Sequence, residues 1–306
     1  MVRSVNGFAT MAATIMIIVL TSVIIASIPN SSFSQVPYTI VHQTTPNATA
    51  AITTTKVAMP TTVDKFGIEK IYPTKRGGRE WYVNMDNPKN DSIFTTSTQQ
   101  NMIKESDDSW HLFGREVRMH VITPITAQPW KNVEITGYVR VDSIIYHKNS
   151  YRDIAWLARS GIHTDNLPCD GTALIGGIHD DGTVGWKKEI WFTGGYTKEL
   201  AIAKVTDPLL GRWIGWKVVI YNISNDSAVK MESYLDDKNN NHWVKVTDLI
   251  DNGGWYADSS DKKFNSANCG KPKDYVMINP GPIVTFRSDN IIWDFKNLSV
   301  REIEAS

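Results

Sequence analysis

Short stretches in which hydrophobic and polar residues alternate recur along the chain from about residue 80 onward. In residues 229–236 (VKMESYLD), Val229, Met231 and Leu235 fall on one face and the charged residues on the other, as on a half-buried β-strand. Gly, Asn, Asp and Pro separate the stretches, which is typical of turns between strands. The predicted strands are 80–85, 115–123, 133–146, 153–159, 172–178, 188–193, 213–223, 229–236, 242–250, 275–278, 283–287 and 291–303.

Helical periodicity is scarce in the same region. Only residues 198–205 (KELAIAKV) have a pattern that predicts a turn or two of helix. Many short strands with almost no helix predict an all-β fold in which two antiparallel sheets pack as a sandwich. No internal repeat is visible, which disfavours a propeller or a solenoid.

The N-terminal 34 residues have a different character. Residues 8–28 are uncharged and mostly apolar, long enough to cross a bilayer as a helix. They also fit a long secretory signal, because Ser32-Phe33-Ser34 offers a small-x-small cleavage site. Arg3 favours an anchor with its N-terminus inside. Both interpretations predict an extracellular domain, secreted or anchored by this helix.

Residues 35–64 are rich in Thr, Ala and Pro, and they predict a disordered linker because such a stretch cannot bury enough apolar surface to order itself. The expected organisation is therefore a signal peptide or anchor over 1–34, the linker over 35–64 and the β domain over 65–306. Six N-x-S/T triplets would permit N-glycosylation: Asn30, Asn47, Asn90, Asn222, Asn225 and Asn297.

Charge and cysteine content narrow the expected partners and compartment. Lys+Arg and Asp+Glu both number 32, so the net charge is zero and no nucleic-acid partner is predicted. Membrane contact is expected only through the N-terminal segment. In an oxidising compartment, Cys169 and Cys269 predict one disulfide, with two unpaired buried thiols as the alternative. Two cysteines without a CxxC spacing make a zinc site unexpected.

No cofactor is expected, and calcium is the one ion with partial support. In residues 236–243 (DDKNNNHW), Asp236, Lys238 and Asn240 alternate as in a calcium loop. The glycine at the sixth position and the distal glutamate of an EF-hand are missing. A solvated hairpin is the preferred interpretation.

Candidate chemistry is concentrated between residues 115 and 196. As a strand, REVRMH would place Arg118 and His120 on one face, and an arginine there could clamp a carboxylate with two hydrogen bonds. Arg159 and His163 would share a face if the strand continued regularly through Gly161. His179 precedes a DDG turn, where it could equally be a polar residue at the end of a hairpin.

The segment WKKEIWFTGGY adds aromatic groups and hydroxyls. Lys188 alternates with Ile190, so the other face carries Glu189 and Trp191. Trp186 and Trp191 could stack on sugar rings, and Tyr196 follows a Gly-Gly loop. The candidate catalytic residues are His163, His179, Lys188 and Tyr196; the candidate substrate-binding residues are Arg115, Arg118, Arg159, Trp186, Glu189 and Trp191.

These residue types suit removal of a proton next to a carboxylate: a cation neutralises the carboxylate, a base takes the proton and an acid protonates the leaving oxygen. A retaining glycoside hydrolase needs two carboxylates about 5 Å apart. A compact E-x-D-x-E strand that would supply them is absent from the sequence, which disfavours hydrolysis.

The chain resembles the concanavalin-like jelly rolls, and within them the alginate-lyase and glucuronan-lyase type. REVR (115–118) is similar to the R-S/T-E-x-R strand of those lyases, and GIH (177–179) is similar to their Q-I/V-H. The resemblance implies carboxylate binding by Arg115 and Arg118 and a base at His179. Gly177 replaces the glutamine, and the Y-F-K-x-G-x-Y-N-Q signature has no counterpart, so the resemblance also fits a protein that binds without cleaving.

Two functions follow as hypotheses. The first is an extracellular protein that binds a polysaccharide or surface glycan, uronate-containing in one version, and cleaves it by β-elimination. The second is a non-catalytic glycan-binding or cell-surface interaction module.

Overall fold

The computed structural model describes residues 62–97, 101–145, 151–164, 166–257 and 268–305. The predicted N-terminal helix, all but the last residues of the predicted linker, and the triplets at Asn30 and Asn47 lie outside these ranges. Within the described ranges, no helix is long and apolar enough to span a membrane.

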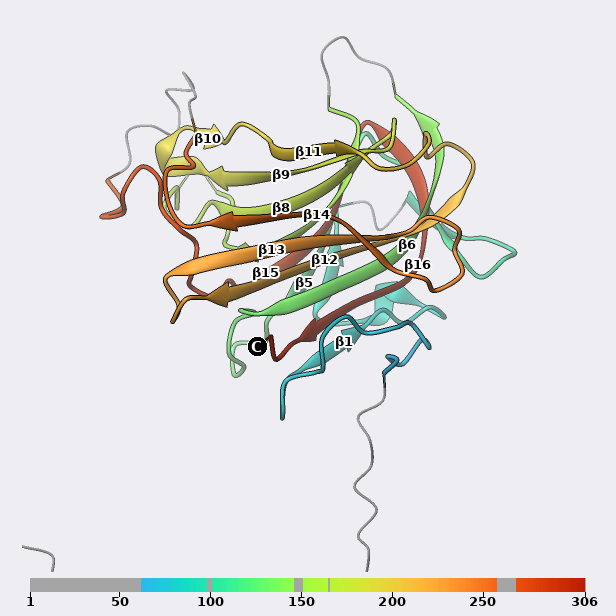
Figure 1. Cartoon of the computed structure of the whole chain (residues 1–306). Coiled ribbons are helices and arrows are strands. Elements are labelled where there is room, and N and C mark those ends of the chain that lie inside the picture. Colours follow the sequence, from blue (N-terminus) through green and yellow to red (C-terminus); the bar gives the residue numbers. More distant parts are fainter. Residues whose placement is uncertain (1–61, 98–100, 146–150, 165, 258–267, 306) are drawn as a thin grey trace, which may run out of the picture. The chain divides into compact units, whose positions relative to one another are not determined.

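Two antiparallel sheets pack face to face, and the predicted all-β sandwich is confirmed (Figure 1). In the first sheet the order is β14 (Val244–Asp251), β13 (Ala228–Asp236), β12 (Trp213–Ile223), β6 (Val133–Ile144), β16 (Ile291–Glu302), β4 (Trp110–Leu112) and β3 (Met102–Lys104), with β1 (Glu80–Tyr82) also paired to β16. In the second sheet it is β10 (Gly195–Tyr196), β9 (Thr183–Ile190), β8 (Thr172–His179), β7 (Asp153–Ser160), β15 (Ile283–Asp289), β5 (Glu116–Ile122) and β2 (Phe94–Thr96), with β11 (Leu200–Lys204) also paired to β9. Among the described residues, the 3₁₀ turns η1 (Pro88–Asn90) and η3 (Trp191–Thr193) connect strands.

Most predicted strands match the observed ones within a few residues, and three segments differ. The helical turn predicted for 198–205 is wrong, because Leu200–Lys204 form strand β11 against β9. Pairing with an existing strand edge overrides a weak local preference. Strand β9 begins at Thr183 and ends at Ile190, where η3 turns the chain. Residues 275–278 form no strand.

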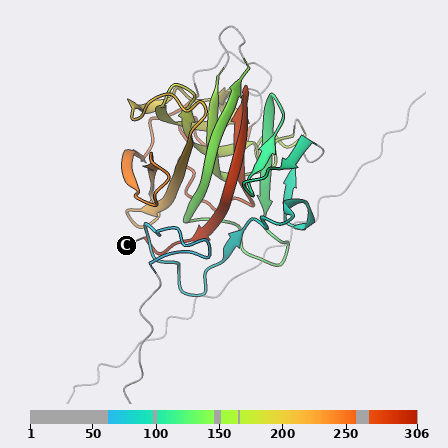
Figure 2. The same cartoon turned by 90° about the vertical axis from the view of Figure 1, so that its right-hand side faces the viewer.

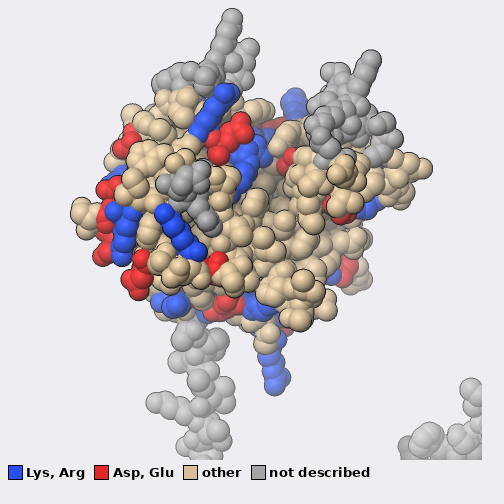
Figure 3. All heavy atoms as spheres, turned by 180° about the vertical axis from the view of Figure 1, so that it is seen from behind, with Lys and Arg blue, Asp and Glu red and all other residues tan. Residues whose placement is uncertain are grey.

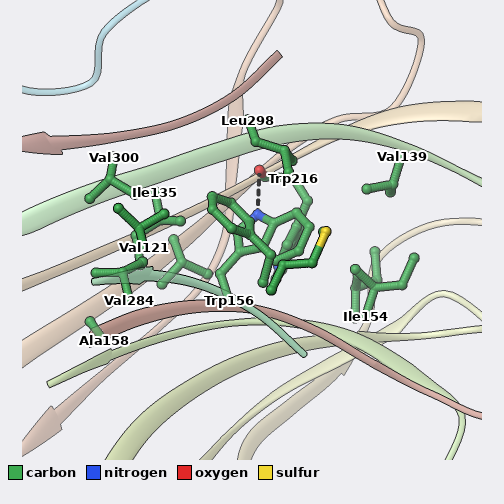
Figure 4. Packing of buried hydrophobic residues seen from close by; sticks show 14 of the residues in the cluster. Val121, Ile135, Val139, Ile154, Trp156, Ala158, Trp216, Val284, Leu298 and Val300 are labelled. Carbon is green, nitrogen blue, oxygen red and sulfur yellow. Dashed lines mark hydrogen bonds between the residues drawn. The ribbon is translucent and has the colours of Figure 1, made fainter. Parts of the chain in front are cut away.

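Two tryptophans join the two sheets reciprocally at the centre of the core. The indole Nε1 of Trp156 on β7 donates to the carbonyl oxygen of Trp216 on β12 at 3.0 Å (Figure 4). Trp216 Nε1 in turn donates to the carbonyl oxygen of Gly176 on β8 at 3.4 Å. Both side chains are fully buried. Each indole thus satisfies its only donor while its ring fills the space between the sheets.

Glycines make room for these large rings. A Cβ at Gly137 would lie 2.5 Å from Leu298 Cδ2 and 3.1 Å from the Trp156 ring. A Cβ at Gly176 would lie 2.7 Å from Val218 Cγ2 and 2.9 Å from the Trp186 ring. The core is therefore packed against glycine backbone at these two points.

The other face of the first sheet carries a buried charge cluster. Glu134 on β6 contacts Lys217 on β12 at 2.8 Å and Arg301 on β16 at 2.7 Å, and all three side chains are almost completely buried. Residues 62–74 cover the cluster, with the backbone N–H groups of Ile71 and Tyr72 donating to Glu134. Figure 2 shows this segment (blue) crossing the lower part of the domain beside β16. The segment is a strap with isolated bridges, Val63 to Glu69 and Thr74 to Ile303, and it contains no strand.

The predicted disulfide is present, and it joins Cys169 to Cys269. It links the loop after β7 to the segment that precedes β15, across a sequence separation of 100 residues. In the chain-entropy model, closing a loop of this length stabilises the folded state by about 4–5 kcal/mol.

Replacing Glu134 by Gln should lower the free energy of unfolding by about 3–5 kcal/mol, because it leaves Lys217 and Arg301 buried without their carboxylate. Urea denaturation measures the change. Glu304→Gln, at an exposed position near the C-terminus, is the control and should change stability by less than about 0.5 kcal/mol. Equal effects of the two substitutions would show that the cluster does not stabilise the fold.

Candidate functional site

The outer face of the second sheet carries the charged residues that the core excludes. In the strand register, Arg118, Arg287, Ala155, Gly177 and Gly185 lie side by side on β5, β15, β7, β8 and β9. The arginines therefore stand next to three positions with small or absent side chains. This arrangement follows from strand alternation, since the preceding and following residues on these strands face the core.

One cavity of about 250 Å³ opens on this face; we call it the central pocket. Its lining comes from four strands of the sheet, from β10, η3 and from the loop after β7. The lining residues are Arg118, His120, Leu157, His163, Glu189, Trp191, Tyr196, Thr285 and Arg287. Five predicted site residues, Arg118, His163, Glu189, Trp191 and Tyr196, are thus brought together.

The sheet curves around the central pocket. Tyr196 on β10 and Arg287 on β15 are separated by three strands, yet Arg287 Nη1 donates to the Tyr196 hydroxyl at 3.1 Å. Neighbouring strands lie about 4.8 Å apart, so a flat sheet would hold these two strands about 19 Å apart. Their contact therefore bridges the face above the intervening strands.

Two arginines share one carboxylate beside the central pocket. Asp289 accepts from Arg118 Nη2 at 2.7 Å and from Arg287 Nε at 2.6 Å. Burial alone would raise the pKa of Asp289, but the two guanidinium groups outweigh it and the pKa is lowered. The Nη1 edge of Arg287 donates to the neutral hydroxyl of Tyr196. This edge can exchange the hydroxyl for a carboxylate, which binds a guanidinium more strongly.

His163, Glu189 and Trp191 form the opposite wall. His163 Nε2 lies 3.3 Å from Glu189 Oε2, and Trp191 Nε1 donates to Glu189 Oε1 at 2.6 Å. The rings of His163 and Trp191 meet edge to face with centroids 5.2 Å apart. Burial would raise the pKa of Glu189, but the bonds from His163 and Trp191 lower it overall. Glu189 therefore stays ionised and fixes both rings.

His120 supplies an uncharged imidazole to the central pocket. Its Nδ1 lies 2.9 Å from Thr285 Oγ1. Burial is the main cause that lowers the pKa of His120 below its ordinary value of 6.5, and the charges of His163 and Arg118 add to it. Such an imidazole is available as a proton acceptor near neutral pH.

The Tyr196 hydroxyl is the candidate proton donor. Burial raises its pKa most and Glu189 adds to this, while Arg287 acts in the opposite direction without cancelling it. The hydroxyl is therefore protonated, and its side chain is 45% exposed at the mouth of the central pocket.

His179 lies elsewhere on the same face, next to Glu199. His179 Nε2 is 3.1 Å from Glu199 Oε1. Burial alone would lower the pKa of His179, but the hydrogen bond and charge of Glu199 raise it overall. An imidazole held in its charged form is poorly suited to the role of base that the lyase resemblance implied for it.

Two predicted ligand contacts prove to be interior residues. Trp186 is fully buried in the core beside Gly176, so its indole cannot stack on a sugar ring. Lys188 is also fully buried, and its ammonium contacts Asp251 at 2.9 Å and the carbonyl oxygen of Tyr275 at 2.9 Å. Alternation predicted correctly that these two face away from Glu189. The error was to assign binding roles to both faces of β9.

Arg159 and Arg115 are also displaced from the predicted surface. Arg159 has a positive φ of 57°, which breaks the strand alternation before His163. Its guanidinium is buried and donates to backbone carbonyls of Lys131 and Met277. Arg115 precedes β5, and its Nε donates to Asn290 at 3.0 Å. Neither arginine lines the central pocket.

Sequence reasoning missed Arg287, Thr285 and Asp289. The signal was present, because IVTFRSD alternates and places these three on the face opposite Val284 and Phe286. The separation of these three residues from the nearest predicted site residue, Tyr196, by about 90 positions in the sequence concealed the signal. Glu199 was missed because its segment had a helical pattern.

Metal-binding groups are not gathered in the described parts of the chain: no three His, Cys, Asp or Glu side chains there lie close enough to hold an ion. In the turn between β13 and β14, Asp236 accepts from the Tyr138 hydroxyl and from the N–H groups of Asn240 and Asn241. The carboxylate oxygens of Asp236 thus stabilise a hairpin, which was the preferred interpretation of residues 236–243 over a calcium loop.

Comparison with known proteins gives structural similarity only. No protein-family model and no curated protein matches the sequence. The fold is similar to basic winged bean lectin bound to Tn-antigen, with 8% identity, a TM-score of 0.42, and coverage of 73% of this chain and 97% of that one.

Two further solved structures are similar to a comparable degree. The exoplasmic/lumenal domain of VIP36 in its Ca²⁺/Man-bound form has 9% identity, a TM-score of 0.44, and coverage of 73% and 88%. A galectin-like protein of unknown function from Bacillus subtilis has 10% identity, a TM-score of 0.44, and coverage of 77% and 100%. At this level, similarity carries no statement about what the present chain binds.

His179 and His120 should titrate on opposite sides of 6.5, with the pKa of His179 above this value and that of His120 below it. NMR of the ring protons, assigned with His179→Gln and His120→Gln, measures both. Glu199→Gln should lower the pKa of His179, whereas Glu304→Gln should not change it. Identical titration of His179 in both variants would contradict the ion pair.

The ion pair of His179 and Glu199 also predicts a pH window in which it stabilises the fold. Because the pKa of His179 is raised, its contribution is present below its unfolded pKa and is lost as pH rises through its folded pKa. Because the pKa of Glu199 is lowered, its contribution is lost as pH falls through its folded value. The difference in unfolding free energy between the natural protein and Glu199→Gln should therefore shrink at both ends.

Proposed function

We propose that the central pocket binds a glycan that carries carboxylate groups. The observation that carries this proposal is the convergence of Arg118 and Arg287 with Trp191 and Tyr196 around one cavity. Aromatic rings next to a few placed polar groups are typical of small-molecule and sugar sites. A carboxylate that replaces the Tyr196 hydroxyl at Arg287 would gain a charge-assisted hydrogen bond.

Recognition of the acidic group is local. Seen from behind (Figure 3), Lys and Arg side chains lie among Asp and Glu side chains, and neither sign dominates this view. The net charge of zero agrees with this mixture. A long-range field that would attract any polyanion is therefore not part of the proposal, and selectivity rests on the guanidinium of Arg287.

The proposed place of action is outside the cytoplasm. The disulfide between Cys169 and Cys269 supports it, because such bonds persist in oxidising compartments. The apolar segment 8–28 supports it from the sequence, as a secretory signal or a membrane anchor.

A second candidate function is cleavage of the same glycan by β-elimination, and the uncharged His120 beside Arg118 favours it. His120 would take the proton from the sugar carbon next to the carboxylate, and Arg118 or Arg287 would stabilise the resulting negative charge. The electron pair then forms the C4–C5 double bond as the bond to the leaving oxygen breaks. Tyr196 would protonate that oxygen.

Arg287→Ala should weaken binding of a uronate polymer by about 10- to 100-fold, because a hydrogen bond to a charged group is lost. Isothermal calorimetry with alginate, polygalacturonate and polyglucuronate measures this, with carboxyl-reduced polymer as the neutral probe. Arg212→Ala is the matched control, since Arg212 does not line the pocket and pairs instead with Asp237, which follows β13 of the other sheet. Equal binding of reduced and native polymers would contradict recognition of the carboxylate.

Cleavage should appear as unsaturated ends that absorb in the ultraviolet during incubation with the bound polymer. His120→Ala and Tyr196→Phe should each abolish this signal, while binding changes by less than about tenfold. Binding without any ultraviolet product would overturn the elimination and leave a non-catalytic glycan-binding module.

A further inference from the structure

Tyr151 lies on the same outer face as the central pocket without lining it. It lies two residues before β7, and its carbonyl oxygen accepts from Asn290 Nδ2 at 2.7 Å, which fixes its backbone. The side chain is 56% exposed, which is unusual for an aromatic ring beside a sheet of buried charges. The contacts of the Tyr151 ring with its neighbours explain how it is held in place while it remains exposed.

Two cationic side chains support the ring. Lys187 Nζ lies 3.9 Å from the centroid of the Tyr151 ring, and the ring of His179 stacks on it with centroids 6.2 Å apart and planes at 29°. A cation this close to a ring is attracted by its π electrons. Tyr151 is therefore held in place on these two residues, and the remainder of its surface faces solvent.

Both supporting residues are themselves fixed by carboxylates. Lys187 contacts Asp153 at 3.2 Å and His179 contacts Glu199 at 3.1 Å. Lys187 and Asp153 are nearly completely buried. Neither can move away without leaving the charge of the other buried and unpaired. The ring is thus preorganised, and a ligand that stacks on it loses little additional side-chain entropy in the protein.

The Tyr151 ring and the residues that support it lie next to the central pocket. Lys187 beneath the ring and Glu189 in the pocket wall are two residues apart on β9, which is about 7 Å, and they face the same side. A glycan unit in the pocket would therefore have its neighbour within reach of Tyr151. The exposed phenol also offers both a flat apolar surface and a hydroxyl, the combination that suits a sugar ring.

We propose that Tyr151 is the stacking platform of a second subsite, which binds the sugar ring adjacent to the one held in the central pocket. The inference rests on the proposed function, and it adds that the ligand is a chain of at least two sugars. The second ring is recognised by its flat face, so it needs no carboxylate. Asp153, Lys187, His179 and Glu199 are positioning residues for Tyr151.

The test compares a single sugar unit with a six-unit oligomer, both taken from the uronate polymer that the natural domain binds best in the panel above. Tyr151→Leu keeps an apolar cover over Lys187 but removes the flat ring. It should weaken binding of the hexamer by about 3- to 10-fold and leave binding of the single unit, which the pocket alone can hold, within about twofold. Tyr151→Phe should bind both ligands as the natural protein does, because it retains the ring.

Two further variants separate the possible failures. Arg287→Ala should weaken binding of both ligands, since Arg287 acts in the pocket. Tyr256→Leu is the matched control, because Tyr256 is 41% exposed and lies 4.0 Å from Lys273, but follows β14 of the other sheet. Thermal unfolding verifies that each variant is folded.

Unchanged hexamer binding in a folded Tyr151→Leu, with weakened binding in Arg287→Ala, would overturn the second subsite and retain the pocket. Equal weakening of single-unit and hexamer binding by Tyr151→Leu would also overturn it, because Tyr151 would then act through the pocket. Unchanged binding in Arg287→Ala would overturn the proposed function itself.

Discussion

The reciprocal hydrogen bonds of Trp156 and Trp216 fix how the two sheets face each other. Each indole donates to the backbone of the opposite sheet, so the bonds have a defined direction and cannot be satisfied if either strand slips by one residue. With Trp156 and Gly176 turned inward, their neighbours Ala155 and Gly177 must face outward. The row of small residues on the outer face, which we call the floor, is therefore a consequence of how the core packs.

That floor explains the electrostatics of the site. Because Ala155, Gly177 and Gly185 leave space, long side chains extend over this floor: Arg287 on β15 meets Tyr196 on the edge strand β10, and Glu199 occupies the position above Gly185. The charges meet in pairs there, and most are shielded from water. Arg287 is the exception in one respect, since one of its edges is bonded to a neutral hydroxyl. The proposed recognition of a carboxylate depends on this contact between the guanidinium of Arg287 and the uncharged hydroxyl of Tyr196.

Alternation in the sequence was sufficient to predict the sandwich, most of its strands and the faces of β5 and β9. It placed Arg118 on the outer face of β5 and Glu189 on the outer face of β9, because these faces are set by the local period alone. Trp191 and Tyr196 follow β9 in η3 and β10, and alternation within β9 does not place them. It did not reveal the positive φ at Arg159, which turns that side chain into the interior, nor the buried partner of Lys188, Asp251, which lies 63 residues away. Alternation in residues 283–289 gives the face on which Arg287 lies, but only the pairing of β15 with β5 and β7 brings that face to the site, and no local pattern encodes this pairing.

The most direct test of carboxylate recognition observes Arg287 itself. NMR of the arginine Nε–H groups, assigned with Arg287→Lys and Arg118→Lys, would follow each guanidinium as a uronate oligomer is added. The account predicts that the Arg287 signal shifts with saturation while that of Arg212 stays unchanged, and that the carboxyl-reduced oligomer produces no shift. Saturable binding that leaves Arg287 unaffected, or an equal response to the neutral oligomer, would contradict it.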